Sequence, residues 1–408
     1  MWLLNKLLTR VVRKGQLSIT NADGKTYTYG APDPSLKNVA VRFNDSRVAF
    51  KVASDPGLGA GEAYMQQRLD MTEGTIADLI ELFYINGHWE NGGPSTRGFS
   101  ELMGTLYARV DRLNWERRSK RNVAHHYDLS DRLYDLFLDA DRQYSCAYYT
   151  DPANTLEQAQ ADKKAHIAAK LNLKEGQRVL DIGCGWGGMA LYLNKVADVD
   201  VLGVTLSEEQ LKVARQRAEA AGVADRVKFE LIDYRAVTEK FDRIVSVGMF
   251  EHVGPSHYRA FFRKCRELLA DDGVMLLHTI GRMGGPGTTD RWTSKYIFPG
   301  GYSPALSEVV RASEYEKLIP TDIETLRVHY AYTLDEWYRR CVAAHAEIVA
   351  LYDEKFYRMW TFYLTAAASS FRHGTMCNYQ LQYVKRREAL PLTRDYIAAE
   401  EVRLRGVS

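Results

Sequence analysis

A disulfide framework, a membrane-spanning run and a strong net charge are all missing from this sequence. Its 408 residues include five cysteines, at positions 146, 184, 265, 341 and 377, with no C-x-x-C pair. Cysteines scattered in this way favour a reduced, cytoplasmic protein. No apolar run approaches the roughly 20 residues that cross a bilayer as a helix. The net charge of +2 is too small to indicate a nucleic-acid-binding protein, and we expect no nucleic-acid partner.

The first residues, MWLLNKLLTRVVRKG, form an amphipathic pattern. Basic residues and Trp2 accompany an apolar stripe at helical spacing, which consists of Leu3, Leu4, Leu7, Leu8, Val11 and Val12. A helix of this kind either lies in a membrane interface or packs on its own domain. The sequence leaves both interpretations open.

The rest of the chain predicts two domains. Residues 17–30 alternate around an Asp23–Gly24 turn, which is typical of a β-hairpin, and helical stretches follow. We therefore assign residues 1–115 to a small α+β domain. Over residues 116–408, short apolar runs alternate with helical segments. This alternation predicts a doubly wound, Rossmann-like α/β sheet whose ligands bind at the carboxyl ends of the strands.

A glycine-rich turn follows the first predicted strand of this sheet, in VLDIGCGWGG (179–188). Gly183 and Gly185 would let a ligand lie close to the backbone, and Asp181 could accept a hydrogen bond from its amine or hydroxyl. The turn differs from the G-x-G-x-x-G of dinucleotide enzymes. A D-x-G-x-G-x-G turn in this place is typical of S-adenosylmethionine (SAM) methyltransferases.

The next two strand ends fit a nucleoside site of unusual composition. Many SAM enzymes carry an acidic residue after the second strand, but this chain has Thr205 there, with Gln210 one turn into the next helix. Hydroxyl and amide groups can make the same hydrogen bonds to a ribose. Tyr234, after the third strand, would border the adenine.

The segment QYSCAYY (143–149) places Cys146 among three tyrosines just ahead of the glycine turn. Taken alone, this cysteine is most simply a packed thiol, and His278 a satisfied core histidine. No two of Cys146, Glu251, His278 and Tyr330 have the spacing of zinc ligands, so we predict no metal site. A hydrolase with a Cys146 nucleophile would leave the glycine turn unexplained.

Eight segments together resemble the cyclopropane-fatty-acyl-phospholipid synthases, and mycolic acid cyclopropane synthases share several of them. They are HHYDLSDRLYDLFLD, QYSCAYY, LDIGCGWGG, GVTLS, DRIVSVGMFEHVG, LLHTIG, YIFPGG and FRHGTMCNYQ. The resemblance covers roughly residues 120–390, and the first 115 residues match the family's lipid-associated domain more loosely. Ser130–Asp131 stands where a Gly–Asn pair is frequent, which leaves the substrate preference open.

The resemblance implies a reaction and a site. These enzymes transfer the SAM methyl group to a cis double bond of an acyl chain, and the cation loses a proton as a cyclopropane ring closes. By resemblance, a bound bicarbonate is the base, held by Cys146, Glu251, His278, Tyr330 and the backbone N–H of Ile280. The resemblance also implies that SAM is bound by Tyr144, Ser145, Asp181, Gly183, Gly185, Thr205, Gln210 and Tyr234.

Further expectations follow from the same resemblance. The aromatic helical segment after Pro320 fits an acyl-chain site, and the basic first helix fits a peripheral enzyme on the inner face of a phospholipid bilayer. Family members are commonly dimers, so we expect a homodimer. Two alternatives stay open: a methyl- or methylene-branched product that needs a separate reductase, and a silent lipid-binding protein on the same fold.

Overall fold

The computed structural model describes residues 1–87, 90 and 129–405, which belong to two compact units. The first unit comprises Met1–Phe137, Thr288–Gly301 and Ala331–Met376. The second comprises Leu138–Gly287, Tyr302–Tyr330 and Cys377–Ser408. The domain boundary predicted at residue 115 lies outside the described residues. Residues 331–376, which the sequence groups with the second domain, pack with the first unit.

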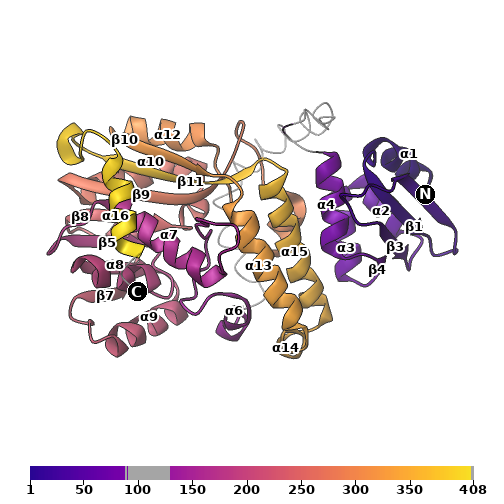
Figure 1. Ribbon diagram of the computed structural model, residues 1–408, viewed down its shortest axis with the longest axis horizontal. Helices are drawn as coiled ribbons and strands as arrows, with labels where there is room; N and C mark the ends of the chain where they lie inside the picture. The colour runs from indigo at the N-terminus through magenta and orange to yellow at the C-terminus, as the bar shows by residue number, and fades with distance from the viewer. Residues whose placement is uncertain (88–89, 91–128, 406–408) are drawn as a thin grey trace. The chain divides into compact units, whose positions relative to one another are not determined.

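The first unit contains a four-stranded sheet in the order β2-β1-β3-β4, on the indigo part of the chain (Figure 1). Its strands are β1 (Gly15–Thr20), β2 (Thr26–Ala31), β3 (Val39–Phe43) and β4 (Leu69–Glu73). The predicted hairpin is confirmed, since β1 and β2 pair antiparallel from Gly15↔Ala31 to Thr20↔Thr26. Gly24 in its turn has a φ of +81°, a conformation that favours glycine.

Helices from distant parts of the chain complete this unit. They are α1 (Trp2–Val11), α2 (Val48–Ser54), α3 (Pro56–Met65), α4 (Ile76–Asn86), α6 (Asp131–Phe137), α11 (Arg291–Tyr296), α13 (His329–Ala343), α14 (His345–Leu351) and α15 (Glu354–Arg372). Helix α15 packs on α3 and α4, and Arg358 donates to Asp70 at 3.0 Å. An aromatic cluster forms around Phe137, whose ring centroid lies 5.7 Å from those of Trp337 and Trp360. These buried rings explain why the aromatic segment joins the first unit.

The first helix packs on its own unit through its apolar stripe, as one of the two interpretations above expects. Leu4 and Leu8 of α1 are buried, as is Val12 just after it, and α1 contacts α2 and β2. Trp2 nevertheless remains 75% exposed, with the Lys6 ammonium 5.6 Å from its ring centroid. Among the described residues, no helix combines the length and apolar character of a membrane span.

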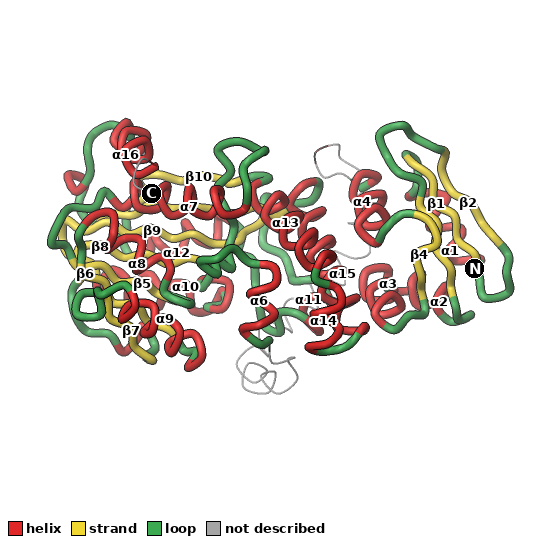
Figure 2. The backbone as a smooth tube through the Cα atoms, turned by 60° about the horizontal axis from the view of Figure 1, so that its bottom comes forward, coloured by secondary structure: helices red, strands yellow, loops and turns green. Residues whose placement is uncertain are grey.

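The second unit is built on a seven-stranded sheet in the order β10-β11-β9-β8-β5-β6-β7, drawn in yellow in Figure 2. Its strands are β5 (Arg178–Ile182), β6 (Asp200–Thr205), β7 (Val227–Leu231), β8 (Phe241–Val247), β9 (Leu269–Arg282), β10 (Ile319–Leu326) and β11 (Met376–Val384). The β5–β6, β6–β7, β5–β8 and β8–β9 pairs are parallel, and β10 pairs antiparallel with β11. The predicted Rossmann-like methyltransferase sheet is confirmed.

Two groups of helices contact this sheet. They are α7 (Leu156–Leu171) and α8 (Gly188–Ala197), with α16 (Asp395–Arg405) packed on α7, and the mutually packed α10 (Tyr258–Leu268) and α12 (Leu306–Tyr315). Helix α9 (Glu208–Ala220) lies against β6 and β7. Because β5, β6, β8 and β9 run parallel, the predicted site residues at or just beyond the carboxyl ends of β5, β6 and β8 share one edge of the sheet, and His278 of β9 lies level with the end of β8.

Truncation of the buried face of α1 tests how the first helix is held. We expect Leu8→Ala to lower the free energy of unfolding by about 2–5 kcal/mol, because it leaves a cavity against the sheet domain. Leu3→Ala, on the exposed side of the same helix, should change it by less than about 0.5 kcal/mol. Urea unfolding of the two variants makes the comparison, and equal losses would contradict the packing described.

Candidate active site

The QYSCAYY segment (residues 143–149) has no regular secondary structure and is held by α7. The Gln160 side-chain amide donates to the backbone carbonyls of Gln143 and Ser145, both at 3.1 Å. The Lys163 ammonium donates to Gln143 Oε1 and Ser145 Oγ, both at 2.7 Å. The sequence analysis missed Gln160 and Lys163. The sequence feature that could have indicated them is the recurrence of polar residues at every third position of α7, including Gln160 and Lys163, on a helix whose other positions are rich in alanine.

The far end of the segment is fixed by a stack of rings. The Tyr148 ring stacks on two imidazoles. Its centroid lies 4.1 Å from that of His166, with 8° between the ring planes, and 5.0 Å from that of His329, with 6° between the planes. The Tyr149 backbone N–H donates to His329 Nδ1 at 3.0 Å. His329 immediately precedes Tyr330, a predicted site residue that is itself buried. Through His329, the stack therefore fixes the QYSCAYY segment against the residues that include Tyr330.

Cys146 lies at the centre of this segment and is fully buried. Its thiol donates to the Ala147 carbonyl oxygen at 3.3 Å. Burial raises the pKa of this thiol well above its ordinary value. The group is a neutral S–H donor rather than a thiolate, which argues against a nucleophilic cysteine.

Glu251 and Ile280 come together, although their contact differs from the predicted one. Glu251 lies just after β8, and its Oε1 accepts a hydrogen bond from the Ile280 N–H at 2.5 Å. This N–H, expected to donate to a bound anion, is thus directed at the glutamate. Glu251 Oε2 is buried without a hydrogen-bond partner, and burial raises the pKa of this carboxyl to about 7.

His278 on β9 is buried, and both of its ring nitrogens face amides of β11. Asn378 Nδ2 lies 3.4 Å from Nε2, and Gln380 Nε2 lies 3.2 Å from Nδ1. Burial, helped by the positive charge of Lys163, lowers the pKa of His278 to about 3. The imidazole is therefore neutral, and β11 fixes the plane of its ring.

The glycine turn after β5 offers a cradle for a ligand. Gly185 has a φ of +55°, and a Cβ atom added there would meet nothing within 4 Å. At Gly183 an added Cβ would lie 2.8 Å from Met249 Cβ, so the turn is tightly packed on that side. Asp181 is buried, its Oδ2 has no hydrogen-bond partner, and burial raises its pKa to about 7. An unsatisfied buried carboxyl beside open backbone fits a ligand that carries amine or hydroxyl donors.

The remaining predicted cofactor residues border the same edge of the sheet. Thr205 Oγ1 donates to Gln210 Oε1 at 3.2 Å at the start of α9. Tyr234 packs edge-on against Phe261, with centroids 5.5 Å apart. Tyr144 is partly buried within the segment held by α7.

Two leucines at this edge were missed by the sequence analysis. Leu206 is 74% exposed, directly after β6, and Leu231 is 45% exposed at the end of β7. The register pairs Thr205 with Leu231, so both leucines lie at the carboxyl edge of β6 and β7. The sequence signal for Leu206 is its position between the polar residues of GVTLSEEQ.

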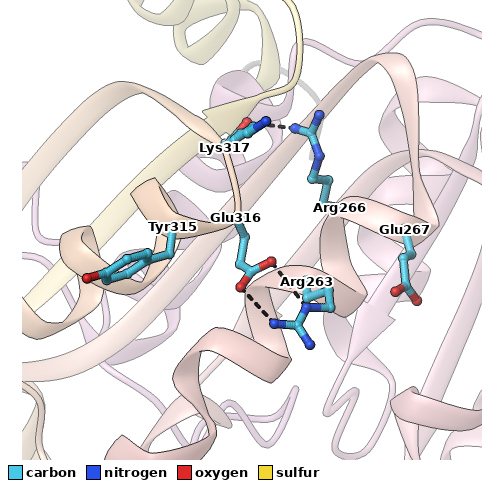
Figure 3. Close-up of a pocket in the computed structure, with 6 residues that line it drawn as sticks. All are labelled: Arg263, Arg266, Glu267, Tyr315, Glu316 and Lys317. Carbon is cyan, nitrogen blue, oxygen red and sulfur yellow. Dashed lines mark hydrogen bonds and ion pairs between the residues drawn. The ribbon is translucent and has the colours of Figure 1, made fainter.

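A hollow of about 370 Å³ lies elsewhere on the second unit, against α10 and the turn after α12 (Figure 3). It holds none of the predicted site residues. Its arginines are already engaged, because Arg263 pairs with Glu316 and Arg266 donates to the Lys317 carbonyl oxygen. Among the described residues, no three His, Cys, Asp or Glu side chains form a group that could hold a metal.

Comparison with known proteins agrees with this fold and site. The family model of mycolic acid cyclopropane synthetase matches residues 115–381. The chain belongs to this family. A second model, a domain of unknown function (DUF7884), matches residues 3–89. The resemblance inferred from the sequence is confirmed.

Individual relatives cover most of the chain. The cyclopropane-fatty-acyl-phospholipid synthase of Escherichia coli K12 is 41% identical over 335 residues, which are 81% of this chain and 84% of the relative. A probable fatty acid methyltransferase of Pseudomonas putida is 40% identical and covers 89% of this chain and 90% of its own. The crystal structure of mycolic acid cyclopropane synthase CmaA1 complexed with SAH and CTAB superposes with a TM-score of 0.61. That protein is 36% identical, with 64% of this chain and 97% of the other covered.

The unsatisfied Asp181 predicts a pH-dependent stability cost. Its pKa is higher in the folded state than the ordinary 3.8, so its contribution to stability is complete below about pH 4 and is lost as the pH rises through about 7. We expect Asp181→Asn to stabilise the ligand-free protein by on the order of 2 kcal/mol at pH 8 and by little at pH 4. Urea unfolding at both pH values measures this. A gain of equal size at the two pH values would contradict the role of ionisation.

Proposed function

We propose that this protein is a SAM-dependent cyclopropane-fatty-acyl-phospholipid synthase. It transfers a methyl group to a cis double bond of a phospholipid acyl chain, and the intermediate loses a proton from the new methyl group as the ring closes. Family membership and the 41% identical synthase support this. The observation that carries the proposal is a pair of buried carboxyls with unpartnered oxygens. Asp181 lies near the carboxyl end of β5, and Glu251 follows the neighbouring strand β8.

The residues of the glycine turn suit SAM. When bound, SAM supplies an electrophilic methyl group. Asp181 Oδ2 would accept from its ammonium or hydroxyl groups, and the open face of Gly185 would admit it against the backbone. Thr205 and Gln210 offer a hydroxyl and an amide for the ribose. The exposed faces of Leu206 and Leu231 offer apolar contact to a flat ring such as adenine.

The second carboxyl suits a bound base. An alkene has no proton that a base could remove to activate it, so the base is needed only after methyl transfer. Bicarbonate would supply that base, with Glu251 Oε2 as acceptor of its O–H and Cys146 and Tyr330 as donors. Because burial raises the pKa of Glu251 to about 7, this carboxyl carries less negative charge near neutrality and repels an anion less.

The burial of these residues also serves the chemistry. Water that reached the carbocation would trap it as an alcohol, so the site must exclude solvent. Cys146, Glu251 and His278 are all buried. Their positions are fixed by α7, by the Ile280 N–H and by the amides of β11, which keeps the reacting groups in line.

A second outcome of the same methyl transfer has one observation in its favour. The 40% identical relative is named as a probable fatty acid methyltransferase, not as a cyclopropane synthase. Proton loss from the acyl chain would give a methyl-branched alkene. A hydride shift followed by proton loss from the new methyl group would give a methylene branch, which a separate reductase could convert to a methyl branch. A silent lipid-binding role is disfavoured, because the cofactor and base residues are all present.

We also infer that the first unit binds the surface of a phospholipid bilayer. Trp2 is 75% exposed and Phe50 is 69% exposed, while Lys6 lies beside the Trp2 ring and Lys51 follows Phe50. Exposed aromatic rings among basic side chains suit the interface of an anionic membrane. The inner membrane face and a homodimer, both expected from the resemblance, remain proposals.

Substitution of the base-binding carboxyl tests the function. The purified protein is incubated with SAM and vesicles of cis-unsaturated phospholipid, with and without bicarbonate, and the released fatty acids are analysed by mass spectrometry. We expect a product heavier by one CH₂ that resists hydrogenation, and a loss of about 100-fold or more in kcat for Glu251→Gln. Glu267→Gln, on the exposed side of α10, is the control. A product that hydrogenation saturates would favour the branched alternative, and no product would refute the proposal.

The membrane contact has its own test. We expect the double variant Trp2→Ser and Phe50→Ser to bind anionic vesicles about tenfold or more weakly in cosedimentation, because two interfacial rings are lost. Tyr315→Ser, which removes an exposed ring from the second unit, is the control. Equal binding by all three proteins would contradict the inference.

A further inference from the structure

We propose that Lys163 is a positioning residue for SAM, and that it acts by turning the hydroxyl proton of Ser145 towards the carboxylate of the bound cofactor. The inference rests on the proposed SAM-dependent function and deepens it. It concerns a residue on α7, behind the segment that carries Tyr144, Ser145 and Cys146.

The burial of Lys163 needs an explanation. The side chain is 0% exposed, and lysine is almost never fully buried unless it is paired. Its two hydrogen-bond partners, Gln143 Oε1 and Ser145 Oγ, are neutral and lie at 2.7 Å, while the nearby Asp139 and Asp141 carboxylates stabilise its charge electrostatically. Burial outweighs them and lowers the pKa of this ammonium to about 8, so its charge is costly in the folded state. An apolar side chain of similar length would fill the same space without this charge, although Gln143 Oε1 would lose its donor.

Lys163 fixes which atoms of Ser145 and Gln143 donate hydrogen bonds and which accept them. An ammonium has only donors, so Ser145 Oγ must act as the acceptor in their contact. The Ser145 proton is then directed away from Lys163 and is available to a group that accepts. Gln143 is oriented by the same rule, because its Oε1 faces Lys163 and its Nε2 donates to Asp141 Oδ2 at 3.0 Å. Lys163 thus sets the donor direction of both side chains.

The backbone of the segment is fixed independently. Gln160 binds the carbonyls of Gln143 and Ser145, and the Tyr148 N–H donates to the Ala159 carbonyl oxygen at 3.0 Å. Removal of the Lys163 ammonium therefore leaves the backbone held, while Ser145 loses its fixed direction. An oriented serine hydroxyl near a buried positive charge suits a carboxylate, and SAM carries one on its methionine part.

Binding of two ligands by the full-length protein tests this role. SAH carries the amino-acid carboxylate and ammonium of the cofactor, whereas methylthioadenosine has the same nucleoside without either group. We expect Lys163→Met to weaken SAH binding at least tenfold in calorimetry and to leave methylthioadenosine binding within about twofold. Lys174→Met, which removes an exposed charge just after α7, should change neither affinity by more than about twofold.

A second variant keeps the test decisive if Lys163→Met folds poorly. Ser145→Ala should also weaken SAH binding selectively, and Lys163→Met should add little to that loss in the double variant. Equal losses for both ligands, no loss for SAH, or additive effects of the two substitutions would overturn the proposal. No acyl substrate is used, so these outcomes are independent of the lipid product. Failure of the wild-type protein to bind SAH would instead refute the SAM-dependent function itself, and this inference with it.

Discussion

The clamp of α7 on the QYSCAYY segment is the interaction on which the proposed site depends. A buried stretch without secondary structure must find partners for its backbone elsewhere. Here Gln160 supplies them for two carbonyls, Lys163 supplies them for two side chains, and Tyr148 is stacked between two imidazoles. The segment can then present Ser145 and Cys146 in one fixed arrangement. Loss of the clamp would leave the glycine turn intact but separate the cofactor site from the base.

The site also carries polar groups that the fold does not satisfy. Asp181 and Glu251 each bury a carboxyl oxygen without a partner, and burial raises the pKa of both to about 7. Such groups destabilise the folded protein, and a sequence keeps them where a ligand completes their hydrogen bonds. Stability and function therefore oppose each other at these two positions. The free oxygens mark where the ligand donors are expected.

Local sequence patterns predicted much of the fold, but they could not predict contacts between segments that are distant in the sequence. The β1–β2 hairpin followed from its turn residues, and the parallel sheet followed from the alternation of apolar runs with helices. The Glu251–Ile280 hydrogen bond could not be predicted, because it joins residues 29 positions apart across two strand ends. Nothing in the local sequence around Lys163 indicates burial, and only the packing of α7 shows it to be buried. The grouping of residues 331–376 with the first unit likewise depends on aromatic packing that no periodicity reports.

The deuterium retained from a labelled methyl group distinguishes ring closure from proton loss along the acyl chain. With SAM whose methyl group carries three deuterium atoms, ring closure gives a product that keeps two of them and resists hydrogenation, because the third leaves as the deuteron taken by the base. A methylene branch would also keep two, but hydrogenation would saturate it. High-resolution mass spectrometry of the released fatty acids counts the deuterium retained. A product that keeps all three would mean that the proton is lost from the acyl chain, and it would contradict ring closure through the base site built around Glu251 and Cys146.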